Sequence, residues 1–165
     1  MSFLDPRQYL INAGLLACML VMRVLIAPRQ YSKSFDLLMI LGMLYPFGEM
    51  LQSIREVPAF IRWHLSDAGV IFNVMTACAM AYVIGLVTAA RARKIGHAIC
   101  LYFFLMEFTD ILGSAMGFTS LTRGDPIDAL SMAVAYGISL HLVKKIEMER
   151  EVIVREQAQS LKRAF

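Results

Sequence analysis

The sequence lacks the short motifs that identify most soluble enzymes. It contains no GxSxG elbow, no phosphate-binding P-loop, no Rossmann glycine pattern and no HExxH zinc motif. It also lacks a convincing secretory signal, because Met1–Gln8 is polar and no small-residue cleavage site follows the first apolar run. We therefore expect no cleaved leader, and the sequence indicates neither a reaction nor a cofactor.

Cysteine and charge are also scarce. The three cysteines, Cys18, Cys78 and Cys100, all lie in apolar runs and form no CxxC pair, so we expect buried free thiols. Charged residues make up 18% of the chain, and the net charge of +3 is spread over short loops and the C-terminal tail. Such a distribution is typical of topology control and not of a nucleic-acid partner.

Apolar residues are abundant. They make up 58% of the 165 residues, and the mean hydropathy is +0.60, more than a soluble domain carries. Five segments approach the roughly 20 residues that a bilayer requires. They are Tyr9–Ala27, Phe35–Ile54, Asp67–Ala90, His97–Phe118 and Pro126–Val143. The chain is thus predicted to be an all-α, polytopic membrane bundle over residues 1–143, with the lipid bilayer as its surroundings.

Local signals separate the spans. Pro28, a loop at Pro58, an Arg91–Gly96 turn and an Arg123–Pro126 turn are the expected breaks. Pro46 is expected to kink the second span, since proline lacks the N–H of a helical hydrogen bond.

Basic residues predict the orientation. One set of span ends carries Arg23, Arg29, Lys33, Arg91, Arg93, Lys94 and the basic tail from Lys144, whereas the other carries only Arg7, Arg55, Arg62 and Arg123. The richer set should be cytoplasmic, which puts the N-terminus outside. Residues 144–165 are predicted to continue the last helix as a charged amphipathic tail in the cytoplasm.

Polar side chains interrupt the spans, mostly in their outer halves. An ionisable group in hydrocarbon costs about 2.5 kcal/mol or more, so such groups usually face a protein interior, a watery cavity or a partner. Glu107 lies in mid-span, where it has no helix-capping role. The candidate ligand-binding residues are Glu49, Arg62, His64, Asp67, Asn73, Glu107, Asp110, Arg123 and Asp128.

Two hairpins share the pattern R-x4-D-A. It occurs at Arg62–Ala68 and Arg123–Ala129, and a glutamate precedes each in the previous span. The hairpins are consistent with a degenerate parallel repeat, whose site would lie at the repeat interface. The alternative is structural, because an aspartate that opens a helix caps free N–H groups and pairs with the preceding arginine.

The histidines argue against a zinc site. His64 is expected near the outer face, but His97 and His141 fall towards the cytoplasm, so they cannot share one ion. A mixed set of His64, Asp67, Glu49 and Glu107 is compatible with the predicted topology. Its spacing is not diagnostic, and we predict no metal.

Small residues recur at helical spacing in two places. Ala77, Ala81 and Gly85 are four residues apart, and Gly113 and Gly117 form a GxxxG pair. Both patterns predict close helix packing, either inside the chain or between subunits.

Residues 102–137 resemble VanZ-like membrane proteins. The resemblance rests on Glu107-Phe108, Gly113, Gly117, Arg123, Asp128 and Tyr136-Gly137. His64-x-x-Asp67 is similar to the family's paired Asp and His in reverse order, and the asparagine that often follows the final aspartate is absent. The resemblance covers at most half of the chain and implies an envelope role, with a lipid-linked or glycopeptide-like ligand and no settled reaction.

We therefore expect an integral protein, with the bacterial inner membrane as its location. Its acid-lined cavity in the outer half of the bilayer would bind, or modify, a polar or amphiphilic envelope ligand, with Arg62 and Arg123 at the mouth. A different class also fits: an accessory or assembly subunit that docks other membrane subunits, or itself, through the small-residue faces and the tail. An ion- or proton-coupled transporter, a holin and an immunity protein are further alternatives.

Overall fold

The chain is helical throughout the part that the structure describes. The computed structural model describes residues 6–26, 32–51, 58–117 and 125–164, and no strand occurs in these ranges. The helices are α1 Pro6–Ile26, α2 Lys33–Gly42, α3 Leu44–Leu51, α4 Ala59–Val83, α5 Ala89–Ala115 and α6 Pro126–Ala164. Five spans, with α2 and α3 as one, are long and apolar enough to cross a membrane. This confirms the helical class and five membrane-length helices.

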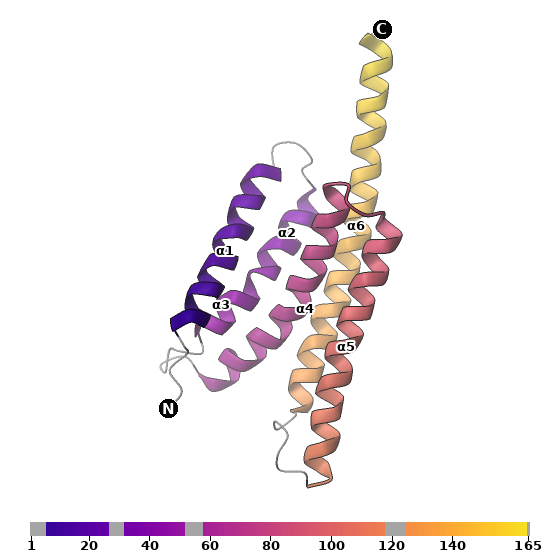
Figure 1. Cartoon of the computed structure of the whole chain (residues 1–165). Coiled ribbons are helices and arrows are strands. Elements are labelled where there is room, and N and C mark those ends of the chain that lie inside the picture. Colours follow the sequence, from indigo (N-terminus) through magenta and orange to yellow (C-terminus); the bar gives the residue numbers. More distant parts are fainter. Residues whose placement is uncertain (1–5, 27–31, 52–57, 118–124, 165) are drawn as a thin grey trace.

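Helix α4 is central in the bundle. It packs against α2, α3, α5 and α6, and α1 packs against α2 and α3 (Figure 1). The core between these helices is almost entirely apolar and includes Leu38, Met39, Ile71, Met75 and Ile146. Helix α6 continues past the bundle as the predicted tail (Figure 1). We call the end where α4 and α6 begin the site end, and the end where α6 leaves the bundle the tail end.

The second span is interrupted, as Pro46 predicts. Helix α2 ends at Gly42 and α3 begins at Leu44, with Met43 between them. Because Pro46 has no N–H, the carbonyl of Gly42, four residues earlier, has no helical donor. The side-chain amide of Asn73 in α4 donates to that carbonyl at 3.2 Å instead.

Glycines allow α3 and α4 to pack backbone against backbone. A Cβ on Gly69 would lie 2.4 Å from the backbone nitrogen of Tyr45, and one on Gly48 would lie 2.9 Å from that of Ser66. Neither distance can be relieved by moving a flexible side chain. The close helix contact of this bundle therefore lies at positions that the small-residue patterns did not indicate.

The predicted packing glycines have another role. Gly85 and Gly117 follow the ends of α4 and α5, have φ values of 83° and 80°, and face open space, so that a Cβ on either would meet no neighbouring atom within 4 Å. They end helices in the left-handed conformation that glycine favours. Neither glycine therefore packs against another helix within the chain, and Ala77 is exposed, whereas Ala81 is partly buried and Gly113 is buried. Packing of these residues between subunits stays a prediction.

The predicted bounds of the third span and the turn that follows it are wrong. Helix α4 begins at Ala59, eight positions before the expected start at Asp67, and it ends at Val83 instead of Ala90. The Arg91–Gly96 segment, expected as a turn, belongs to α5, which starts after the N-cap Thr88. The turn moves upstream because Gly85 ends α4 and Thr88 caps the next helix. Pro28, Arg29, Arg55 and the expected span ends Ala27, Ile54 and Phe118 lie outside the described residues.

One turn of α6 joins the helices at the tail end. Glu147 pairs with Arg93 of α5, and Glu149 accepts hydrogen bonds from Ser32 and Ser34 at the start of α2. Arg150 donates to the Tyr82 carbonyl in α4, and its guanidinium lies 4.5 Å from the centre of the Tyr82 ring. These contacts fix the position of α6 where it leaves the bundle.

Helices α1 and α5 expose much of their apolar surface. Leu10 and Val24 of α1 are each 70% exposed, and Phe108 of α5 is 62% exposed.

The three cysteines differ in their burial. All three are free, but only Cys100 is buried, and Cys18 is exposed on α1, so the prediction of burial is wrong there.

Candidate functional site

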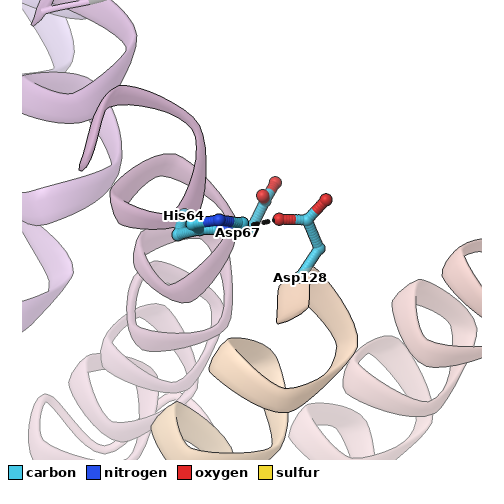
Figure 2. A group of neighbouring side chains, drawn as sticks. All are labelled: His64, Asp67 and Asp128. Carbon is cyan, nitrogen blue, oxygen red and sulfur yellow. Dashed lines mark hydrogen bonds and ion pairs between the residues drawn. The ribbon is translucent and has the colours of Figure 1, made fainter. Parts of the chain in front are cut away.

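Polar side chains from α4 and α6 meet at the site end. His64 and Asp67 are three residues apart on α4 and therefore share a face of the helix. Asp128 lies in the first turn of α6 and points towards them (Figure 2). One ligand atom from each of the three residues lies within 4.8 Å of the others. We refer to His64, Asp67 and Asp128 as the triad.

A side-chain contact in the triad joins the two helices. Nδ1 of His64 bonds to Oδ1 of Asp128 (Figure 2). The two side chains are only 12% and 18% exposed. A contact between polar side chains so far removed from water satisfies groups that would be costly to bury alone.

A second carboxylate lies against this pair. A carboxylate oxygen of Asp67 lies within 4.8 Å of one of Asp128, and Glu107 and Glu49 are close enough to Asp67 to act on it electrostatically. Two adjacent carboxylates repel each other unless a proton or a cation lies between them. One histidine can neutralise at most one of these acids. The triad thus lies among more carboxyl groups than its one histidine can pair with.

The two glutamates are held by neighbours that carried little signal in the sequence. Ser66 is buried and donates from Oγ to Oε1 of Glu49, which joins α4 to α3. The backbone N–H of Asp125 donates to Oε1 of Glu107 at 3.3 Å, and Asp110 interacts electrostatically with Glu107. Ser66 and Asp125 thereby position the acids around the triad.

Asp125 explains why Asp128 is available to the triad. Its side chain accepts from the N–H of Ile127 at 2.9 Å, and Pro126 follows it in the first position of α6. An aspartate cap followed by proline is a common helix start. Asp125 therefore carries the capping role that the sequence offered to Asp128, and the Asp-Pro dipeptide was the signal for it.

The capping interpretation is wrong for Asp67. Since α4 begins at Ala59, Asp67 lies about two turns inside the helix, where no N–H group is free for a side chain to cap. The two aspartates of the R-x4-D-A pattern do meet, but one lies within a helix and the other in a first turn. The pattern therefore does not give the two hairpins equivalent local structures.

The remaining candidates are placed as follows. Asn73 bonds to the Gly42 carbonyl and has a structural partner away from the triad. Arg62 belongs to α4, but its side chain, like all of Arg123, lies outside the described part of the chain. The structure therefore brings together His64, Asp67 and Asp128, with Glu49, Glu107 and Asp110 around them.

The described pockets lie at the other end of the molecule. One of about 80 Å³ is bordered by Ser32, Val83, Ile146, Arg150, Ile153, Val154 and Gln157. It borders the tail and not the triad. The triad is reached from the partly exposed faces of His64 and Asp128.

In chemical terms, the triad offers one imidazole nitrogen and two carboxylates. Among the described residues, it is the group of His, Cys, Asp and Glu whose donor atoms are close enough to hold a metal ion. It differs from the mixed set considered from the sequence, because Asp128 takes the place of the two glutamates. The same groups can also exchange a proton, since imidazole and carboxyl groups are the usual general acids and bases.

Comparison with known proteins gives no further assignment. No family model, no curated protein and no solved structure matches this chain.

Proposed function

We propose that this chain is an integral protein of the bacterial inner membrane and binds a polar or amphiphilic envelope ligand at the site end. The binding residues are the triad with Glu49 and Glu107, and Arg62 and Arg123 are proposed at the rim. The observation that carries the proposal is the convergence of these acids in one region of an otherwise apolar bundle.

The exposed surface supports the membrane location. Large apolar side chains cover the outward faces of α1 and α5, including Leu20, Val21, Leu101, Leu105 and Leu112. A soluble monomer rarely exposes such continuous apolar surface. Exposing apolar side chains to water is unfavourable, whereas exposing them to lipid hydrocarbon is not. The five membrane-length helices are therefore proposed to cross the bilayer.

The distribution of basic residues supports the orientation. The tail end carries Arg23, Lys33, Arg91, Arg93, Lys94, Lys144 and Lys145. Among the described residues, the site end carries two basic residues, Arg7 near the start of α1 and Arg62 near the start of α4. By the positive-inside rule the tail end is cytoplasmic. The triad then faces the outer leaflet, within reach of a lipid-linked molecule.

The polarity of the region supports a ligand-binding role. Acids at this depth are costly unless they are paired or used. Glu49 and Glu107 have hydrogen-bond partners, whereas the contact between Asp67 and Asp128 sets two carboxyl groups against each other, with one histidine to balance them. A ligand that carries positive charge, or that brings a cation, would relieve this repulsion.

The test is retention of the ligand by the full-length protein. The wild type, Asp67→Asn, Asp128→Asn and the control Glu151→Gln, on the exposed tail, are purified from native membranes in mild detergent and analysed by native mass spectrometry. We expect a bound lipid or small molecule on the wild type and the control, and loss of most of it from both aspartate variants. Equal retention in all four proteins, or none in the wild type, would contradict the proposal.

A second candidate function is supported by the tail. Beyond the bundle, α6 exposes Val152, Val154 and Leu161 among its charges. This favours an accessory subunit that docks another protein. Stoichiometric protein partners in the same mass spectra, lost when residues 151–165 are removed, would support that function over the first.

A further inference from the structure

We propose that the triad binds one divalent transition-metal ion, with His64, Asp67 and Asp128 as its protein ligands. The inference rests on the proposed function and deepens it, because the metal would be the group that receives the polar part of the ligand.

The geometry fits a single ion. Donor atoms on one zinc ion lie about 2.0–2.2 Å from the metal and therefore at most about 4.4 Å from one another. The triad's donor atoms lie within 4.8 Å of one another, a limit slightly wider than the one for a single ion. Small side-chain rotations would bring them onto one ion, with the His64–Asp128 contact replaced by two bonds to the metal.

The backbone presents two ligands on one rigid element and the third on another. His64 and Asp67 share a face of α4, which contacts four other helices and is central in the bundle. Asp128 is fixed by the Asp125–Pro126 start of α6. Sites built on helices hold ligands more accurately than sites on loops.

The donor types select the class of metal. Imidazole favours zinc, iron and similar ions, whereas calcium takes six to eight oxygen ligands and magnesium prefers oxygen and water. A single histidine with two carboxylates therefore favours a transition-metal ion such as Zn²⁺. The three cysteines are not part of the triad's donor set, so a sulfur ligand is not expected.

The charge of the ligands suits a divalent ion. Asp67 and Asp128 would bind as carboxylates, and their two negative charges would balance the two positive charges of the metal. Glu107 and Glu49 are near enough to Asp67 to act on it electrostatically, so further acids surround the site.

The number of ligands leaves room for a further group. Catalytic and ligand-binding zinc sites typically have three protein ligands and an open fourth position. An anionic oxygen, from a phosphate or a carboxylate, is the group that would fill it. The metal would thereby join an acidic protein site to an anionic headgroup, which these acids would otherwise repel.

The experiment uses the full-length protein in mild detergent, stripped with EDTA and titrated with Zn²⁺ alone. Isothermal titration and elemental analysis should give about one ion per chain. His64→Gln, Asp67→Asn and Asp128→Asn should each lower the affinity at least tenfold, while the control Glu151→Gln, which changes an exposed acid of the tail, should not. Wild-type affinity in all three triad variants, or an equal loss in Glu151→Gln, would overturn the metal site.

Two further measurements keep the test decisive. X-ray absorption of the zinc-loaded wild type needs no variant and should show oxygen and imidazole nitrogen ligands; a sulfur ligand would overturn the proposal. Native mass spectrometry on the EDTA-stripped protein separates the two proposals. Weak, non-stoichiometric zinc binding with the envelope ligand still retained would overturn the metal site alone, whereas stoichiometric zinc without any such ligand would overturn the proposed function alone.

Discussion

The side-chain amide of Asn73 in α4 replaces the hydrogen bond that Pro46 removes from the second span. It donates to the Gly42 carbonyl at 3.2 Å, the acceptor that Pro46 cannot serve. Asn73 was a ligand-binding candidate in the sequence, but in the structure it stabilises the broken helix.

This relationship predicts a coupling between two substitutions. Asn73→Ala should lower the free energy of unfolding by about 1–3 kcal/mol, because a carbonyl in an apolar bundle loses its donor. In a Pro46→Ala background, the new N–H can bond to Gly42, so the same substitution should cost about 1 kcal/mol less. Thermal unfolding of the four proteins in detergent measures the coupling, and strictly additive effects would show that the two residues act independently.

A second prediction concerns the close contact of α3 and α4. Gly69→Ala should cost about 3 kcal/mol or more, because its Cβ would lie 2.4 Å from the Tyr45 backbone nitrogen. Gly137→Ala is the matched control: it lies within α6, and a Cβ there would meet no neighbouring residue within 4 Å. The control should leave stability unchanged or raise it by up to about 1 kcal/mol. Detergent thermostability measured by gel filtration compares them, and similar values would contradict the packing described for Gly69.

A third prediction concerns the tail end. Glu149→Ala removes the acceptor for Ser32 and Ser34, so α2 and α6 should separate more readily there. Hydrogen bonds to a charged group contribute about 1.5–3 kcal/mol, and faster amide exchange should appear in residues 33–38. Glu151→Ala, whose contact with Arg155 is solvent-exposed, should leave exchange in α2 unchanged. Unchanged exchange in both variants would mean that the serines find other partners.

The fourth prediction tests orientation. In a chain whose native cysteines are replaced by serine, a cysteine at Pro58 marks the site end and one at Ser160 marks the tail. A membrane-impermeant maleimide should label the first in intact cells and the second only after lysis. The reverse pattern would place the triad in the cytoplasmic leaflet and remove the outer-leaflet part of the proposed function.

The sequence predicted those features that depend on neighbouring residues. Apolar runs predicted five membrane-length helices, and Pro46 predicted the break in the second. His64 and Asp67 were expected on one face of a helix because they are three residues apart. The Asp125–Pro126 start of α6 was also readable, although the capping role was assigned to Asp128.

Features that depend on packing could not be predicted. The contact between His64 and Asp128 joins residues 64 positions apart, and it exists only because α4 and α6 lie side by side. The place of Asp67 in the helix could not be predicted, because α4 begins eight residues before the apolar run that starts at Asp67. The close contact through Gly48 and Gly69 likewise has no regular spacing, since each glycine faces the other helix's backbone.

The continuity of α6 has a mechanical consequence. Asp128 of the triad and Glu149 of the tail end stand on one uninterrupted helix, roughly 32 Å apart at ~1.5 Å per residue. A rotation of α6 about its axis would therefore move Asp128 relative to His64. The contacts of Glu147, Glu149 and Arg150 with α5, α2 and α4 oppose such a rotation at the tail end.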